Sequence, residues 1–174
     1  VATAKAAARS DTLMMLSTGS NCSLEEVAEA STGPLWFQLY HRGKALTEML
    51  VHRAEAAGYK AIVLTIDVPV PSPKERDLRN KFESTLGLGN FRDLNLPRNV
   101  IRGTDETPGW DVSRVDPITW KDLEWLRSLT SLPLVLKGQA VCASLCMCVR
   151  MCLCGCVRFL CMCQRGMQWV GAVV

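Results

Sequence analysis

The sequence predicts an α/β fold in which helices cover a parallel sheet. Short apolar runs of strand length recur along residues 1–138, and segments with helical periodicity separate them. The apolar runs are nearly continuous rather than alternating, which is typical of parallel strands that are buried on both faces. Strands that alternate with amphipathic helices indicate an α/β architecture.

Four segments have the length and composition of buried strands, and each becomes polar at its C-terminal end. They are residues 13–17 (LMMLS), 35–40 (LWFQLY), 61–67 (AIVLTID) and 132–137 (LPLVLK).

Helices are expected between these strands. Residues 23–30 open on the capping box Ser-Leu-Glu-Glu, and residues 45–57 stop at Gly58. A further helix opens at Thr119 and ends before the next strand. The Ala-rich N-terminus also has a helical composition. The inward residues expected on the second helix are Leu46, Met49, Leu50, Arg53, Ala54 and Ala57, and those on the helix after Thr119 are Leu123, Leu126 and Leu129.

Polar residues at the strand ends point to a ligand site, because ligands bind at the C-terminal edge of parallel sheets. Residues two apart on one strand share a face, so each strand end presents its polar side chains together. The alternative for a serine or threonine here is simple capping of a neighbouring backbone group. The candidates are Ser17, Gln38, Tyr40, Thr65, Asp67 and Lys137.

Residues 68–117 form a long segment with little periodicity that holds six of the eight prolines. A loop of this length is usually functional or disordered. Its charged run, residues 74–79, has a plainer alternative as a solvated helical turn with i,i+3 ion pairs.

Four motifs occur in one order along the chain: FQLY, LT-x-D-x-P, ERD-x-RN and LP-x-x-x-KG. Together they resemble the FMN-dependent L-2-hydroxy acid oxidases and dehydrogenases, such as glycolate oxidase, lactate oxidase and mandelate dehydrogenase. The resemblance covers residues 1–138. It implies a partial (β/α)8 TIM barrel, about strands 2 to 5 of 8, with FMN at the C-terminal face.

The resemblance also implies roles for the strand-end residues in holding the flavin. Ser17, Gln38 and Thr65 resemble the residues that hydrogen-bond the flavin ring. Lys137 resembles the lysine beside the flavin N1 region, where a fixed ammonium stabilises the negative charge of the reduced flavin.

Three further residues are implied on the substrate side. Tyr40 resembles the tyrosine that hydrogen-bonds the substrate, and Asp67 resembles the aspartate paired with the catalytic histidine. Lys74 stands where the family places an arginine that clamps the substrate carboxylate. A lysine there keeps the charge but loses the bidentate fork.

The family's catalytic histidine lies in an S-N-H-G-G-R-Q segment, which this sequence lacks. Its two histidines, His41 and His52, are expected to be exposed polar residues. The phosphate-binding turns after strands seven and eight are also absent. We therefore expect this chain, which begins with Val and reads as a fragment or processed chain, to bind FMN weakly or not at all and to be inactive.

A cysteine-rich tail, residues 139–174, follows the family-like segment and holds eight of the nine cysteines. Its C-x-C and C-x3-C spacings lack the C-x2-C pairs of zinc sites. We interpret it as intron or frameshifted sequence translated past a missed splice site near Gly138. Soft-metal binding and a buried structural role stay open, so the alternative function is a non-catalytic metal- or redox-binding protein.

The net charge of +3 does not favour nucleic acid or an anionic membrane as a partner. The N-terminus has no apolar core of a signal peptide. By resemblance, the substrate is a small 2-hydroxy acid, complete members are homo-oligomers, and the location is intracellular, in the cytoplasm or peroxisome. The segment DVPVPSPKERD is closer to the lactate and mandelate branch than to plant glycolate oxidase.

Overall fold

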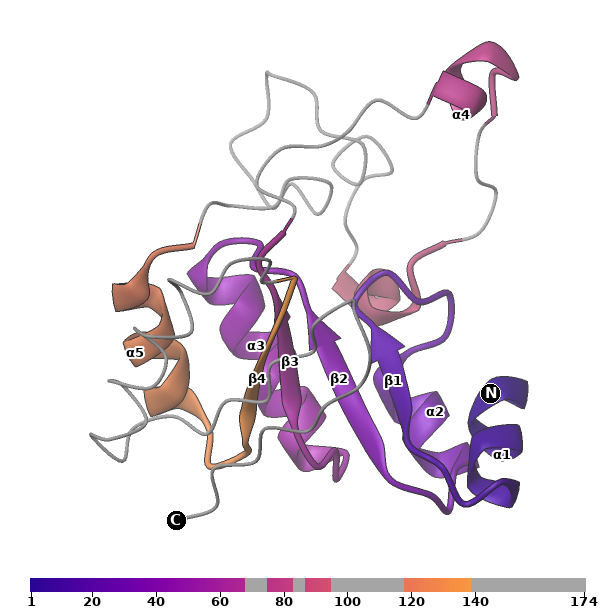
Figure 1. Ribbon diagram of the computed structural model, residues 1–174, viewed down its shortest axis with the longest axis horizontal. Helices are drawn as coiled ribbons and strands as arrows, with labels where there is room; N and C mark the ends of the chain where they lie inside the picture. Colours follow the sequence, from indigo (N-terminus) through magenta and orange to yellow (C-terminus); the bar gives the residue numbers. More distant parts are fainter. Residues whose placement is uncertain (68–74, 83–86, 95–117, 139–174) are drawn as a thin grey trace.

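The computed structural model describes residues 1–67, 75–82, 87–94 and 118–138, which form one parallel sheet with helices beside it (Figure 1). Among these residues, no helix is long and apolar enough to cross a membrane. The strands are β1 (Met14–Ser17), β2 (Leu35–Leu39), β3 (Ile62–Thr65) and β4 (Leu134–Lys137). The helices are α1 (Ala2–Arg9), α2 (Leu24–Ala30), α3 (Lys44–Ala56), α4 (Glu75–Arg79) and α5 (Trp120–Leu129), with a 3-10 helix η1 (Gly89–Leu94).

The strands lie in the order β1-β2-β3-β4, and every neighbouring pair is parallel. This confirms the predicted parallel α/β sheet. The consecutive order is that of a barrel wall, because doubly wound sheets reverse their strand order at a switch point. Tyr40 and Asp67, which the sequence placed inside strands, lie beyond the ends of the ladders.

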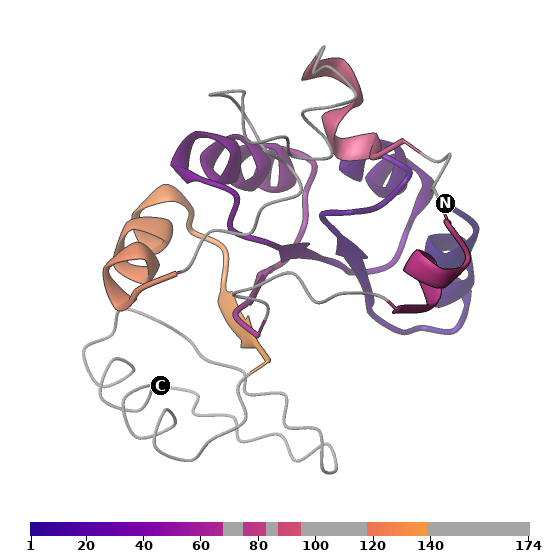
Figure 2. The same ribbon diagram turned by 90° about the horizontal axis from the view of Figure 1, so that it is seen from above.

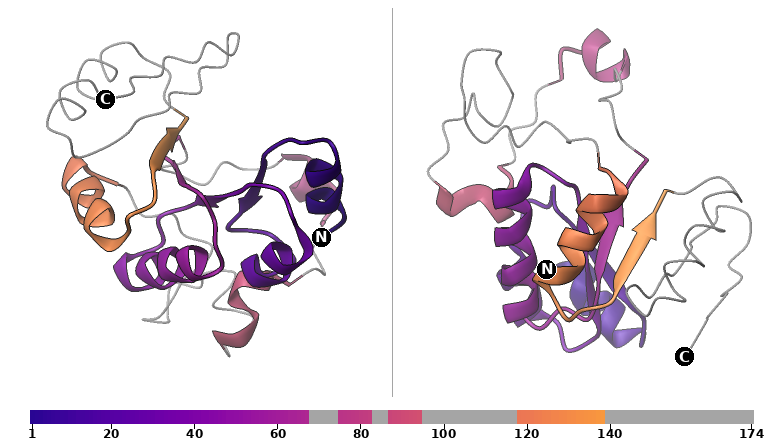
Figure 3. Two further views of the ribbon diagram at one scale, coloured as in Figure 1. Left: turned by 90° about the horizontal axis from the view of Figure 1, so that it is seen from below. Right: turned by 90° about the vertical axis from the view of Figure 1, so that its left-hand side faces the viewer.

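The helices line one face of the curved sheet, as Figures 2 and 3 show for α2, α3 and α5. Every second strand residue faces these helices, and the strand residues on that face are all apolar. The strand residues of this core are Leu16, Leu35, Phe37, Leu39, Ile62, Leu64, Leu134 and Leu136. The other face carries a separate and smaller apolar cluster of Met15, Trp36, Ala61, Val63 and Val135.

The predicted helix ends are confirmed at two places. The Ser23 hydroxyl accepts a hydrogen bond from the Glu26 backbone N–H at 3.1 Å, and the Glu26 carboxylate accepts one from the Ser23 N–H at 2.7 Å. Gly58 follows α3 at φ +83°, a conformation that favours glycine.

The buried face of α3 is wider than the sequence predicted. Leu46, Leu50 and Ala54 are buried as expected, and so are Thr47 and Val51. The Thr47 hydroxyl can be buried because it has a partner in His41 Nδ1 at 3.1 Å, a polar contact that hydrophobic periodicity does not detect.

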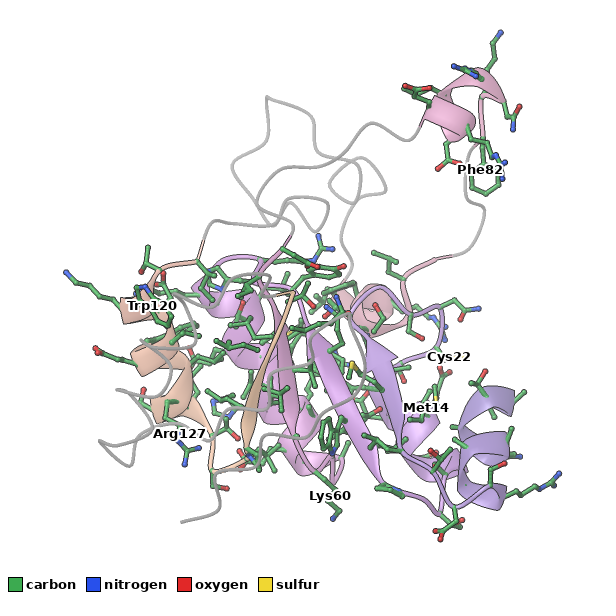
Figure 4. All side chains as sticks on the ribbon, in the orientation of Figure 1. Met14, Cys22, Lys60, Phe82, Trp120 and Arg127 are labelled. Atoms are coloured by element: carbon green, nitrogen blue, oxygen red, sulfur yellow. The ribbon has the colours of Figure 1, made fainter. Side chains whose placement is uncertain are left out.

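Residues 75–79 of the charged run form the solvated helical turn of the plain alternative, whereas Lys74 lies outside the described residues. Helix α4 has no buried residue, and Arg79 pairs with Glu75 at 3.0 Å, at i,i+4 rather than the expected i,i+3 spacing. Phe82, just after this helix, projects from a turn that stands away from the sheet (Figure 4).

Candidate functional site

The predicted site residues that the structure describes gather at the C-terminal edge of the sheet, on the face opposite helices α2, α3 and α5. Ser17 pairs in register with Gln38, and Thr65 pairs with Lys137. Their neighbours one position earlier, such as Leu16 and Leu64, belong to the helix-facing core. Strand alternation therefore turns all four polar side chains to the opposite face.

Three of these side chains form a continuous hydrogen-bonded chain across β1, β2 and β3. The Ser17 hydroxyl donates to Gln38 Oε1 at 2.9 Å, and Gln38 Nε2 donates to Thr65 Oγ1 at 2.7 Å. Gln38 is 7% exposed and Thr65 is 3% exposed. Because buried polar groups need partners, Gln38 is held in one orientation between its neighbours.

Two hydrogen-bond donors of this chain of side chains are not used within it. The Thr65 hydroxyl accepts from Gln38, so its own proton remains available to an acceptor. No acceptor among the described residues takes the second N–H of the Gln38 amide, so it is available in the same way. The edge of β2 and β3 can therefore donate hydrogen bonds to carbonyl oxygens of a planar ligand.

Lys137 and Asp67 form the charged end of the site. Lys137 Nζ lies 3.7 Å from Asp67 Oδ2, and both side chains are 41% exposed. The Ile66 N–H donates to the Lys137 carbonyl at 2.9 Å and extends the β3–β4 ladder to this point. An ammonium beside a half-exposed carboxylate supplies a positive charge that a ligand anion can share.

Gly138 permits this arrangement, because the backbone passes directly against Asp67. A Cβ at Gly138 would lie 2.3 Å from Asp67 Cγ, closer than any real contact, and the residue has φ +100°. The sequence identified this glycine only as part of the LP-x-x-x-KG motif.

Tyr40 directly follows β2, two residues beyond Gln38. Its backbone N–H donates to Thr18 Oγ1 at 3.2 Å, and its ring lies 5.8 Å from the Arg42 guanidinium carbon. The side chain is half-buried. Lys74, the predicted carboxylate clamp, lies outside the described residues.

Two residues that support the site were missed by sequence reasoning. Thr18 is fully buried, and its hydroxyl donates to the Gln38 carbonyl at 2.7 Å. Asn90 donates from Nδ2 to the Thr18 carbonyl at 2.9 Å. The sequence signal for Thr18 was that it places a second hydroxyl next to Ser17. The only sequence signal at Asn90 was the pair Gly89-Asn90, which is typical of an ordinary turn.

The expectation that both histidines are exposed is wrong for His41. His41 is 6% exposed because it packs against Thr47 and the Trp125 ring, whose centroid lies 6.1 Å away. His52 is exposed as predicted and lies 3.7 Å from Glu48.

No group of three or more His, Cys, Asp or Glu side chains within the described ranges could hold a metal ion. The cysteines of residues 139–174 lie outside those ranges. Cys22 is a free thiol in the β1–α2 loop (Figure 4).

A family model described as FMN-dependent dehydrogenase matches residues 1–153. This range extends past Gly138, where the sequence motifs end; a domain boundary at that residue stays a prediction.

Curated relatives include an L-lactate oxidase from Nostoc sp., which is 48% identical over 149 residues, covering 79% of this chain and 40% of the relative. Glycolate oxidase 3 from Arabidopsis thaliana is 40% identical over 142 residues, covering 79% of this chain and 39% of the relative. The chain thus spans about two-fifths of the length of these relatives.

Among solved structures, a mandelate oxidase variant with (S)-mandelic acid matches with a TM-score of 0.69 and 32% identity. The match covers 91% of this chain and 40% of that one. This likeness confirms the predicted α/β fold as part of a TIM barrel.

Proposed function

This chain belongs to the FMN-dependent dehydrogenase family, and from that premise we propose that its strand ends hold the ring of FMN in an oxidation of L-2-hydroxy acids to 2-oxo acids. The observation that carries the proposal is the chain Ser17–Gln38–Thr65 with Lys137 beside it, all on one face at the C-terminal edge. That edge is where barrel enzymes bind ligands.

The residues present fit a flavin by the chemistry of their donors. The Thr65 hydroxyl and the Gln38 amide offer protons from buried, fixed positions, which suits the carbonyl edge of an isoalloxazine ring. When bound, FMN would supply the acceptor for the two electrons that the hydroxy acid loses.

Lys137 would stabilise negative charge at the ring. Its ammonium is held at the end of β4, within 3.7 Å of a single carboxylate oxygen, so its remaining N–H donors can face a ligand. A positive charge fixed where negative charge develops stabilises the transition state.

Asp67 and Tyr40 are proposed to act on the substrate side of the ring. Asp67 would orient a catalytic histidine and favour its protonated form, as the family resemblance implies. The Tyr40 hydroxyl would donate a hydrogen bond to the substrate. Lys74 is proposed to attract the substrate carboxylate as a point charge without a bidentate fork.

The substrate class is inferred from the family, because the relatives described above are named as an L-lactate oxidase and a glycolate oxidase. We propose a small L-2-hydroxy acid for this chain. A homo-oligomeric complete protein, and a location in the cytoplasm or the peroxisome, stay predictions.

We also propose that the 174-residue polypeptide alone does not oxidise 2-hydroxy acids. Neither of its two histidines has the sequence context of the catalytic one. The measurement is flavin absorbance and the consumption of L-lactate, glycolate and (S)-mandelate by the purified chain. Turnover by this chain alone would contradict the proposal.

The positive test is a chimera in which residues 1–138 replace the corresponding segment of the Nostoc L-lactate oxidase. The chimera is expected to bind FMN and oxidise L-lactate, because the strand-end residues are supplied by this chain. A soluble, folded chimera without flavin would overturn the proposed flavin site.

A further inference from the structure

Asn90 lies in η1 and reaches the end of β1 from 72 residues further along the chain. It is 1% exposed. Its Oδ1 accepts from the Leu24 N–H at 2.8 Å, and its Nδ2 donates to the Thr18 carbonyl at 2.9 Å and towards the Ser17 carbonyl at 3.4 Å. One amide therefore joins the start of α2 to the strand end that carries Ser17.

The approach of η1 to this strand end is tight and requires glycine next to Asn90. A Cβ at Gly89 would lie 2.2 Å from the Cys22 carbonyl carbon and 2.5 Å from the Ser23 nitrogen, both backbone atoms. The Gly89 N–H donates to the Ser20 carbonyl at 2.8 Å. Phe91 is 2% exposed in the main core and anchors the segment from the other side.

A third element fixes the backbone of Asn90. The guanidinium of Arg53 on α3 donates to the Asn90 carbonyl at 2.6 Å. The same guanidinium donates twice to Glu25, at 2.7 and 2.8 Å. Asn90 is thus held by α3 while its side chain holds α2 and the end of β1.

Thr18 connects the position held by Asn90 to the backbone of β2 and of the residue that follows it. The Thr18 hydroxyl donates to the Gln38 carbonyl and accepts from the Tyr40 N–H, while its backbone N–H donates to the same Gln38 carbonyl at 2.9 Å. A shift of the Thr18 carbonyl would therefore move the backbone on both sides of Gln38.

We propose that Asn90 is a positioning residue that sets the geometry of the Ser17–Gln38 pair. The role as part of a flavin site rests on the proposed function, whereas the positioning itself concerns only this chain. Asn90 acts through two carbonyls, at Ser17 and Thr18, and needs no contact with a ligand.

The test uses the ¹⁵N-labelled 174-residue chain and the variants Asn90→Asp and Asn90→Ala. Asn90→Asp keeps the acceptor for the Leu24 N–H but removes the donor to Thr18. We expect its Thr18 amide to exchange with solvent at least ten times faster, with the Gln38 side-chain NH2 resonances moved and Leu24 still protected. Asn90→Ala also removes the acceptor of the Leu24 N–H, so the Leu24 amide should then exchange faster as well.

Two controls separate positioning from a general loss of stability. Asn21→Asp makes the same chemical change at an exposed residue of the β1–α2 loop. Leu126→Ala lowers the unfolding midpoint by opening the α5 core, away from this network. Neither should move the Gln38 NH2 resonances.

Unchanged Gln38 resonances and Thr18 exchange in Asn90→Asp would overturn the proposal. It would also be overturned if Leu126→Ala moved the Gln38 resonances as far as Asn90→Asp. None of these signals needs flavin, so a failure of FMN binding would count against the proposed function alone.

Discussion

Lys137 Nζ lies 3.7 Å from Asp67 Oδ2, and the residue after Lys137 leaves no room for a side chain beside that carboxylate. The pair closes the C-terminal edge between β3 and β4. Its geometry depends on a glycine, because the backbone at Gly138 has φ +100° and a Cβ there would overlap Asp67.

Gly138→Ala is expected to lower the free energy of unfolding by about 1–3 kcal/mol, the range for a strained backbone position. The same change should displace the Asp67 carboxylate from Lys137. Chemical denaturation measures the first effect. The matched control is Gly87→Ala, whose added Cβ has no heavy atom of the described residues within 4 Å and which should change stability by less than about 0.5 kcal/mol. Equal effects of the two changes would contradict the steric account.

The buried amide of Gln38 gives a second prediction. Gln38→Leu should lower the free energy of unfolding by about 1–3 kcal/mol, because it leaves the buried Thr65 hydroxyl without its partner. Thr65→Val in the same chain should recover part of that loss, since replacing both partners by apolar groups is nearly neutral. A double-mutant cycle by urea denaturation measures the coupling. Strictly additive effects would show that the hydrogen bond is not made.

The Arg53–Glu25 pair predicts a dependence of stability on pH. The hydrogen bonds from the Arg53 guanidinium hold the pKa of Glu25 below its ordinary value of 4.5. A carboxyl with a lowered folded pKa stabilises the fold above the unfolded pKa and loses that contribution as the pH falls through the folded pKa. Glu25 is 41% exposed, so solvent screens the pair.

Glu25→Gln should therefore lower the free energy of unfolding at pH 7, by less than about 1 kcal/mol. The difference from the unmodified chain should shrink as the pH is lowered below 4.5. Denaturation at a series of pH values measures this, with Glu29→Gln on the same helix as the control. A difference that stayed constant with pH would contradict a role for the Glu25 charge.

The cysteine-rich tail is expected to carry no metal. Its eight cysteines have no C-x2-C spacing, so the purified chain should contain no stoichiometric zinc or copper by elemental analysis. Stoichiometric metal would support the metal-binding alternative.

Comparison of the transcript with the genomic DNA at codons 137–140 should reveal a splice donor. A mature transcript in frame through Val174 would contradict the splice interpretation.

Sequence reasoning predicted the sheet well because continuous apolar runs and capping residues are local signals. All four strands and the capping box at Ser23 were found in this way. Tyr40 and Asp67 were predicted to lie inside strands, whereas the strands end before them. Composition alone cannot tell where a backbone ladder stops.

The support behind the site was not predictable from local patterns. Asn90 contacts Thr18 and Leu24 across more than sixty residues of chain, and no periodicity encodes such a pairing. His41 was misjudged for a similar reason, because its burial depends on Thr47 and on Trp125 from a distant helix. Buried polar residues whose partners are far along the chain carry no sequence period.

The central claim is that the strand-end residues hold a flavin, and the most direct measurement is the dissociation constant for FMN of the lactate oxidase chimera by fluorescence quenching. Lys137→Met should weaken binding about 10–100-fold, since a hydrogen bond to a charged group contributes about 1.5–3 kcal/mol. Lys60→Met is the matched control, because Lys60 lies at the opposite end of the sheet (Figure 4) and should leave binding unchanged. Equal FMN affinity of the Lys137→Met and Lys60→Met chimeras would contradict the account.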